Sequence, residues 1–199
     1  MTQGERILVM ASGAGTILKA LIDSGLPVAA VVTDRQCKAE EIAESKRIRC
    51  VRVLRDNYGE TFDRESYTDE LLHALLDVNP DLIAMAGFGT VLSKEFMSCF
   101  YNRVLNTHPS LLPLFKGWHA VRDALAADAK VTGCTVHIAT DKLDEGPILF
   151  QQAVPILPGD SEESLHARIK EAERKIYPKV IGKFIDSGFS VQPITIDVE

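Results

Sequence analysis

The sequence of 199 residues has few cysteines, and their spacing excludes the common zinc and disulfide frameworks. None belongs to a Cys-x-x-Cys pair or has a histidine at ligand spacing, which is typical of a reduced cytoplasmic protein without structural zinc. The four are Cys37, Cys50, Cys99 and Cys134. Cys134 lies in a strand-like run, so we expect a small buried core residue there rather than a nucleophile.

The sequence also lacks a run of basic residues, a long apolar stretch and a signal peptide. Its formal net charge is −6, so we do not expect nucleic acid binding through phosphate neutralisation. No apolar run approaches the length of a membrane span, and the N-terminus lacks a signal peptide's basic start and apolar core. We therefore expect a cytoplasmic protein. A negative protein can still hold an anionic substrate through backbone amides at a helix end.

Short apolar runs alternate with amphipathic segments along the chain, and no repeat, linker or low-complexity segment divides it. Hydrophobic residues make up 46% of the sequence, enough for a sizeable core in a single domain. The pattern predicts a Rossmann-like α/β fold, an open twisted, mostly parallel sheet with helices on both faces. The expected strands are 6–11, 28–33, 50–54, 82–86, 104–106, 132–140 and 148–154. The expected helices are 16–24, 39–46, 64–77, 93–100 and 120–127.

A last, long helix is expected after residue 160. Asp160 is in position to cap it, with Glu163 three residues on as in a capping box. An apolar stripe from Leu165 to Val180 gives the helix one buried face. Pro178 should bend this helix or end it early.

Two polar segments carry the chemistry. Asn106-Thr107-His108-Pro109 follows the apolar run 104–105, where a buried strand breaks into a proline-stiffened loop. Asp144 lies in the later segment 141–147, which ends in Gly-Pro. Together they supply an amide, an imidazole and a carboxylate, which is the minimum set for moving an acyl group. We expect His108 to be the proton carrier, and His137, on the strand leading to Asp144, to support the site.

A glycine-rich turn, Gly13-Ala14-Gly15-Thr16, joins the first strand to the first helix. Its small residues let backbone amides and the helix dipole approach an anion. Asp34 mimics the ribose-binding acid of a dinucleotide site, but Leu18 stands where the third glycine of that fingerprint belongs. A single phosphate is the better ligand, and a tight turn without any ligand stays an alternative.

The motif Asn106-x-His108 with the downstream segment 141–147 resembles the signature of the folate-dependent formyltransferases, and the similarity runs along nearly the whole chain. The resemblance implies transfer of a formyl group from 10-formyltetrahydrofolate to the amine of glycinamide ribonucleotide, without a covalent enzyme intermediate and without a metal. It makes Asn106, His108 and Asp144 the catalytic residues. It also implies a nucleotide-phosphate-binding half at 1–100 and a catalytic and folate-loop half at 101–199.

The resemblance assigns binding residues as well. The phosphate and ribose of the acceptor would contact the glycine turn, Pro109 and the helical acid Glu173. The substrate-binding set is Gly13, Gly15, Thr16, Ile17, Pro109 and Glu173. The folate would lie along the segment after residue 86, with Arg64 near its glutamate tail. The folate-binding set is Arg64, Gly89, Thr90, Val91, Leu92, Asn106, Asp141 and Asp144.

The chain departs from the family pattern in the glycine turn and in the folate segment. The family often has Asn where this chain has Ala14 and Ile17, so only main-chain contacts to the phosphate are expected there. The family segment Gly-Phe-Met-Arg-Ile-Leu reads Gly-Phe-Gly-Thr-Val-Leu here, and its basic side chain is lost at Thr90. Asp141 also has an ordinary interpretation as a turn-forming residue.

Other functions share parts of these motifs. A formyltetrahydrofolate deformylase has the same catalytic residues and transfers the group to water, but its usual amino-terminal regulatory domain is missing from this chain. A methionyl-tRNA formyltransferase should carry an additional basic domain, for which this chain has no room. A nucleotide-binding module without activity would leave His108 and its partners without a purpose. A homodimer stays an open alternative.

Overall fold

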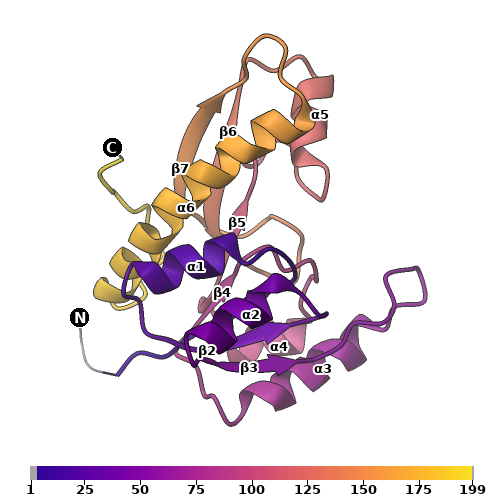
Figure 1. The fold of residues 1–199 in the computed structure, drawn as a ribbon, viewed down its shortest axis with the longest axis vertical. Coiled ribbons are helices and arrows are strands. Elements are labelled where there is room, and N and C mark those ends of the chain that lie inside the picture. Colours follow the sequence, from indigo (N-terminus) through magenta and orange to yellow (C-terminus); the bar gives the residue numbers. More distant parts are fainter. Residues whose placement is uncertain (1–3, 199) are drawn as a thin grey trace. The chain divides into compact units, whose positions relative to one another are not determined.

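The computed structural model describes residues 4–198, so the first three residues of the N-terminal segment considered above lie outside it. The chain divides into two compact units, Met1–Leu105 and Asn106–Glu199 (Figure 1). The expectation of a single domain with halves at 1–100 and 101–199 stays a prediction.

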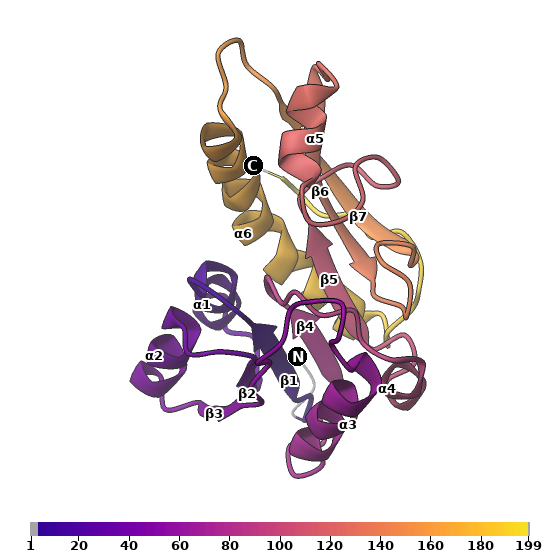
Figure 2. The ribbon, with the colours of Figure 1, turned by 90° about the vertical axis from the view of Figure 1, so that its right-hand side faces the viewer.

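The first unit is built from alternating strands and helices. Its strands β1 (Ile7–Ala11), β2 (Val28–Thr33), β3 (Arg49–Arg52) and β4 (Leu82–Met85) lie parallel, with β1 between β2 and β4. Every residue of β1 and β4 is buried, as continuous apolar strands of a parallel sheet require. Helices α1 (Thr16–Asp23) and α2 (Lys38–Ser45) lie on one side of these strands, and α3 (Arg64–Leu75) and α4 (Lys94–Cys99) on the other (Figure 2).

The second unit carries α5 (Ala120–Ala126), α6 (Glu162–Asp186) and the strands β6 (Val131–Ile138) and β7 (Ile148–Pro155). Strand β5 (Val104–His108) begins at the end of the first unit, and its last three residues belong to the second. The strand order is β3-β2-β1-β4-β5-β6-β7. Within residues 4–198, strands β1 to β4 pair in parallel and β6 pairs antiparallel with β7, which confirms the predicted mostly parallel α/β fold. Element ends differ from the expected ranges by one or two residues, as frayed ends commonly do.

The start of α6 corrects one sequence prediction. Ser161, not Asp160, is the N-cap: its hydroxyl accepts from the Ser164 amide, and the Ser164 hydroxyl accepts from the Ser161 amide. Asp160 instead pairs with Arg168, two turns along the helix, at 2.5 Å, and this guanidinium holds the pKa of Asp160 well below its usual range. Asp160 therefore forms an ion pair with a residue eight positions along the chain instead of capping the helix, and the local sequence pattern does not predict this contact.

The end of α6 shows that Pro178 does not terminate the helix early, which was one of the two predicted effects. The helix continues for eight residues beyond Pro178 to Asp186, although a helix-interior proline removes a hydrogen bond at a cost of about 3 kcal/mol. Pro178 is buried, and the fully buried side chains of Tyr177 and Phe184 flank it along the same helix. Burial of these large side chains outweighs the lost bond.

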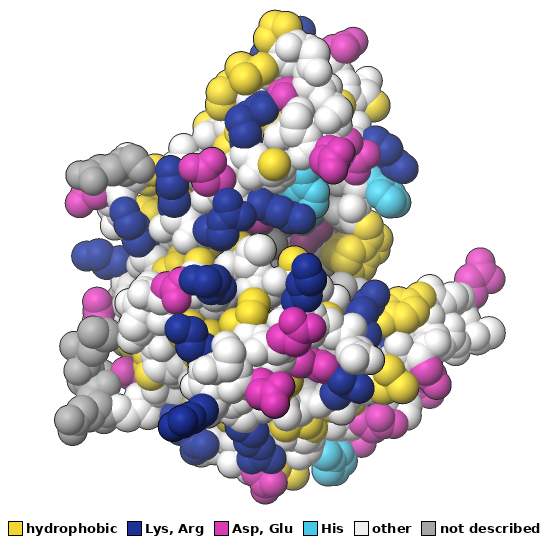
Figure 3. All heavy atoms as spheres, in the orientation of Figure 1, with side chains coloured by type: hydrophobic (Ala, Val, Ile, Leu, Met, Phe, Trp, Pro, Cys, Tyr) yellow, Lys and Arg dark blue, Asp and Glu magenta, His cyan; other side chains and the backbone are white. Residues whose placement is uncertain are grey.

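Charges are spread over the surface of both units. On the face drawn in Figure 3, lysine and arginine side chains are interspersed with aspartate and glutamate. No helix among residues 4–198 is long and apolar enough to cross a membrane. Cys134 is fully buried, as predicted, and all four cysteines are free thiols.

Candidate active site

The end of β5 supplies two of the predicted catalytic residues. Val104 and Leu105 anchor the strand in the core, and alternation then places Asn106 and His108 on the same face two residues apart. His108 is the last residue of the strand and is 5% exposed, and Pro109 begins the loop. The imidazole is therefore held by a rigid element rather than by a mobile loop.

The connection from β6 to β7 supplies the third residue. The loop is closed at its base by a hydrogen bond from the Ile138 amide to the Pro147 carbonyl at 2.9 Å. A side chain at Gly146 would lie 1.6 Å from the Ile138 carbonyl oxygen, so only glycine fits this close approach. Asp144 itself has a φ of 54° and is 7% exposed. The glycine and the left-handed aspartate together turn a carboxylate inward.

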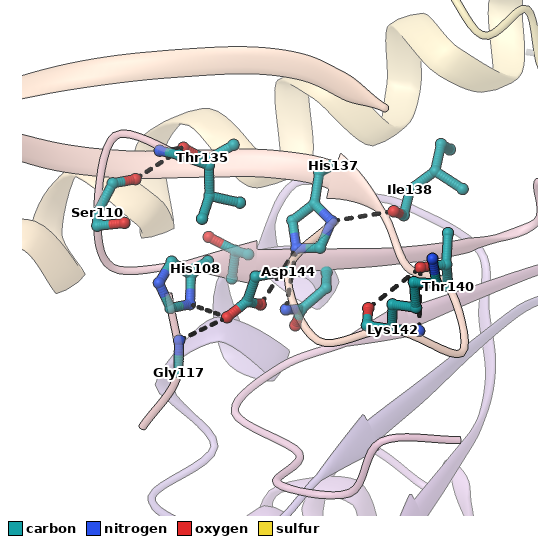
Figure 4. A network of polar contacts seen from close by, with 12 residues as sticks. His108, Ser110, Gly117, Thr135, His137, Ile138, Thr140, Lys142 and Asp144 are labelled. Atoms are coloured by element: carbon teal, nitrogen blue, oxygen red, sulfur yellow. Dashed lines mark hydrogen bonds and ion pairs between the residues drawn. The ribbon is translucent and has the colours of Figure 1, made fainter. Parts of the chain in front are cut away.

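His108 and Asp144 meet in this unit (Figure 4). The His108 Nδ1 atom lies 3.4 Å from the Asp144 Oδ2 atom, and both side chains are almost completely buried. The Gly117 amide donates to the same Oδ2 atom at 2.8 Å, which fixes the carboxylate. The structure thus brings together the imidazole and carboxylate that the sequence analysis paired.

His137 links Asp144 to Asn106. Its Nδ1 atom is 2.9 Å from the Ile138 carbonyl oxygen and must donate to it, while its Nε2 atom is 3.3 Å from the Asn106 amide nitrogen and accepts from it. This pattern requires the neutral ring. Burial lowers the pKa of His137, which favours the same state. Because the Asn106 side-chain amide has two N–H groups, one remains available for a substrate oxygen.

His108 has the opposite surroundings. Its Nε2 atom lies 2.8 Å from the carbonyl oxygen of Phe115, and its Nδ1 atom faces the carboxylate of Asp144. Both neighbours are acceptors, so a proton on Nε2 would donate to the Phe115 carbonyl and a proton on Nδ1 would face the Asp144 carboxylate. The two histidines on either side of Asp144 are therefore suited to different tasks.

A buried hydroxyl fixes the loop that follows β5. Thr135 on β6 donates to the Ser110 carbonyl at 2.7 Å and accepts from the Leu112 amide at 3.1 Å (Figure 4). Gln151 on β7 donates to Thr135 and to the Leu112 carbonyl. With its hydrogen-bonding capacity used, Thr135 ties the proline-stiffened loop to the β6 and β7 pair. Sequence reasoning missed this residue because a threonine within a strand does not indicate which distant backbone groups it contacts.

Glu173 on α6 reaches β5 between the predicted catalytic residues Asn106 and His108. The Thr107 hydroxyl donates to it at 2.9 Å. The glutamate is 6% exposed, and burial raises its pKa to about 7, against the smaller lowering effect of the Thr107 hydrogen bond. The predicted ribose-contacting acid is thus adjacent to the catalytic strand, and Pro109 is half-buried beside it in sequence.

The glycine turn of the first unit has the form that an anion site needs. Gly15 is the N-cap of α1 with a φ of 68°, no side chain caps the helix, and its first turn contains no acidic residue. Gly13 and Thr16 are exposed, whereas Ile17 is buried, so its backbone alone could serve a ligand. The turn is fixed from behind, because the Ala39 amide of α2 donates to the Gly13 carbonyl at 3.2 Å.

The predicted folate segment follows β4 in the same unit. Gly89 and Val91 are partly exposed, Thr90 is 2% exposed, and Leu92 is completely buried. Arg64 lies on the surface at the start of α3, where it pairs with its neighbour Glu65 at 2.9 Å. Asp141, in the second unit, is exposed in the loop before Asp144. These assignments stay predictions.

Comparison with known proteins identifies the family. A family model described as formyl transferase matches residues 5–181. The chain belongs to the formyl transferase family. It is 42% identical to a phosphoribosylglycinamide formyltransferase of Mycobacterium tuberculosis over 94% of this chain and 87% of that protein. A crystal structure of glycinamide ribonucleotide transformylase 1 from Symbiobacterium toebii has a TM-score of 0.87 at 38% identity, over 94% of this chain and 90% of that one.

This formyl transferase also shares its fold with an enzyme of the alternative activity. A formyltetrahydrofolate deformylase from Pseudomonas syringae has a TM-score of 0.82 at 24% identity over 90% of this chain and 61% of that one, a likeness that shows the fold alone. Sequence reasoning missed the backbone partners of the site, the Phe115 carbonyl and the Gly117 amide. Backbone groups leave no residue signature, although Gly117, in a loop and with a φ of 91°, marks a sharp turn there.

Proposed function

We propose that this formyl transferase moves the formyl group of 10-formyltetrahydrofolate to the amine of glycinamide ribonucleotide, a step of purine biosynthesis. The observation that carries the proposal is the buried pair formed by His108, which shares the end of β5 with Asn106, and Asp144 from the β6–β7 loop. The similarity to phosphoribosylglycinamide formyltransferases supports this choice of substrates. The free, widely spaced cysteines favour a cytoplasmic location.

The first step is attack of the acceptor amine on the formyl carbon. A carbon–nitrogen bond forms, and the carbonyl oxygen becomes an oxyanion in a tetrahedral intermediate. The remaining N–H of the Asn106 amide donates to this oxygen, and the doubly protonated His108 ring adds positive charge beside it. His137 keeps the Asn106 amide turned to donate rather than accept.

The second step is collapse of the intermediate. The bond from the formyl carbon to N10 of the folate breaks, and tetrahydrofolate leaves. The amine nitrogen loses a proton while N10 gains one, and Asp144 takes up and relays this proton directly or through water. Burial of Asp144 strengthens its interaction with His108, because few water molecules screen the pair. The protein forms no covalent bond to the formyl group.

The binding residues complete the proposal. The backbone of the turn Gly13 to Ile17 holds the acceptor phosphate, and Pro109 and Glu173 contact its ribose. Main-chain groups of the segment Gly89 to Leu92, with Arg64 and Asp141, hold the folate. The uncapped start of α1 and the exposed backbone of Gly13 support the phosphate assignment.

A single assay tests the proposed function. Purified protein is mixed with 10-formyltetrahydrofolate, with and without glycinamide ribonucleotide, and the folate absorbance is followed while formate and formylated nucleotide are quantified in the same tube. We expect little formate without the nucleotide, and equal amounts of formylated nucleotide and tetrahydrofolate with it. Rapid formate release at a rate that does not depend on the nucleotide would overturn the proposal and establish the deformylase activity instead.

A further inference from the structure

Arg55 connects two loops of the first unit. It lies in the long loop that joins β3 to α3 (Figure 1), and its backbone amide donates to the Asp34 carbonyl at 2.8 Å. Its side chain crosses to the segment after β4, where Nη1 donates to the Gly89 carbonyl at 3.2 Å and to the Thr90 hydroxyl at 2.9 Å. Nε donates to the Asn57 carbonyl at 3.1 Å.

Two aromatic rings fix the plane of this guanidinium. Its central carbon lies 3.9 Å from the ring centre of Phe62 and 4.5 Å from that of Tyr58. Tyr58 is 51% exposed, so the stack stands at the surface of the unit. Stacking on aromatic faces orients an arginine and displaces water from it, which leaves a pre-organised cation.

The charge of Arg55 has no counter-ion within residues 4–198. No carboxylate among residues 4–198 lies within 4.0 Å of the Arg55 guanidinium. Its hydrogen bonds to these residues use Nε and Nη1, and the two N–H groups of Nη2 make none. The neighbouring Arg35, which stacks on the same Tyr58 ring, is neutralised by the buried Asp34 at 2.9 Å. Arg64 is likewise paired with Glu65. Arg55 alone of these three presents an unmatched positive charge.

We propose that Arg55 recognises a carboxylate of the glutamate tail of the formyl donor and thereby determines the affinity for that donor. The inference rests on the proposed function, in which the segment Gly89 to Leu92 holds the folate. A folate is the substrate with free carboxylates, and Nη2 offers two unused donors beside that segment. The Arg55 guanidinium lies against this segment, since it donates to the Thr90 hydroxyl at 2.9 Å.

The test compares two analogues of the formyl donor, with no nucleotide acceptor present so that no formyl transfer takes place. One is 10-formyl-5,8-dideazafolate, and the other is the same compound with both carboxylates of its glutamate converted to uncharged amides. Dissociation constants are measured by calorimetry for the wild type and for the variants Arg55→Gln, Arg55→Lys and Arg49→Gln. Arg49 is the matched control, because it is an exposed arginine of the same unit on β3 and its loss changes the net charge equally.

We expect Arg55→Gln to weaken binding of the glutamate-bearing analogue about tenfold or more, the scale of a hydrogen bond to a charged group, and to change binding of the amide less than about twofold. Arg55→Lys keeps the charge and should recover part of the affinity, and Arg49→Gln should bind both analogues as the wild type does. Circular dichroism checks that each variant is folded.

Two results would overturn the inference. Equal losses for both analogues would mean that Arg55 only shapes the segment, and unchanged affinity for both would mean that it has no role in donor binding. Failure of the wild type to bind either analogue would count against the proposed function itself, which keeps the two claims separate.

Discussion

The catalytic segments of the second unit and the glycine turn of the first unit hold their polar groups in opposite ways. Around Asp144, side chains are buried and each imidazole nitrogen has a fixed partner. In the turn, Gly13 and Thr16 are exposed residues, Gly15 is buried, and no side chain caps the helix. Chemistry needs pre-organised side chains, whereas phosphate binding needs only open backbone amides.

The catalytic segments should therefore respond most strongly to a change of side-chain chemistry. We expect His108→Ala and Asp144→Asn each to lower turnover about 10²–10⁴-fold, because each removes a charge-stabilising or proton-transferring group from a buried site. Asp144→Asn keeps the size and the acceptor for the Gly117 amide. Steady-state turnover measures the effect, and circular dichroism checks the fold. Near-normal turnover in both variants would refute the assigned mechanism.

The second largest effect is expected from a substitution that distorts the conformation of the Asp144 loop. A methyl group in Gly146→Ala would lie 1.6 Å from the Ile138 carbonyl oxygen, so the loop must open and move Asp144 away from His108. We expect turnover about 10 to 100-fold lower, the scale of a misplaced catalytic group. Gly182→Ala on α6 is the control, since its methyl group meets no atom within 4 Å and should stabilise the helix by about 0.5 to 1 kcal/mol. Wild-type turnover in Gly146→Ala would contradict this role.

Substitutions of two glycines in the turn distinguish a role in packing, expected for Gly15, from a role in ligand binding, expected for Gly13. A side chain at Gly15, where φ is 68°, would lie 2.7 Å from Ile42 and 2.9 Å from the Ala39 backbone, so Gly15→Val should lower the free energy of unfolding by about 3 kcal/mol. Gly13 has no atom within 4 Å of that position. We expect Gly13→Val to keep stability within about 1 kcal/mol but to raise the Michaelis constant for the nucleotide about tenfold, by blocking backbone approach.

Urea unfolding and steady-state kinetics on this pair distinguish the two roles. If Gly13→Val left the Michaelis constant for the nucleotide unchanged, the phosphate site would have to lie elsewhere. If Gly15→Val were as stable as the wild type, the packing account of the turn would be wrong.

A smaller effect concerns the buried acid beside β5. Because burial raises the pKa of Glu173 to about 7, the folded protein holds a proton that the unfolded chain releases above about pH 4.3. The contribution of this proton to the free energy of unfolding is fully present below about pH 4.3, and it is lost as pH rises through about 7. The Glu173→Gln variant has no carboxyl group at this position to ionise. Its free energy of unfolding relative to that of the wild type should therefore rise by about 2 to 3 kcal/mol between pH 5 and pH 8.

The measurement is urea unfolding at both pH values, with Glu171→Gln as the control. Glu171 is an exposed acid on the same helix, paired with Lys175 at 3.2 Å, and its variant should show the pH dependence of the wild type. An equal pH dependence for Glu173→Gln and the wild type would show that Glu173 is ionised throughout this range.

The fold class could be predicted from the sequence because it depends on local patterns, whereas the catalytic roles of Asn106, His108 and Asp144 stay a prediction that rests on motifs resembling the family. Apolar runs predicted the buried strands. The spacing of two residues between Asn106 and His108 predicted that both side chains lie on one face at the end of a strand. The cap of α6 was predicted wrongly, because Asp160 is held by Arg168 through a contact that local propensity does not encode. The length of α6 beyond Pro178 likewise depends on packing across the whole helix.

Other parts of the site were beyond sequence reasoning for a different reason. The Phe115 carbonyl and Gly117 amide act through the backbone, which every residue possesses. The contact of Arg55 with Thr90 joins two loops that are 35 residues apart. Such features depend on chain geometry, and only the structure places them.

Single-turnover formyl transfer at saturating donor tests most directly whether chemistry and acceptor binding belong to different segments. The rate is measured by rapid quench over a range of nucleotide concentrations for the wild type, Asp144→Asn and Gly13→Val. We expect Asp144→Asn to lower the maximal rate about 100-fold or more with the nucleotide dissociation constant unchanged, and Gly13→Val to raise that constant while keeping the maximal rate. A fall in maximal rate for Gly13→Val, or a loss of nucleotide affinity alone for Asp144→Asn, would contradict the account.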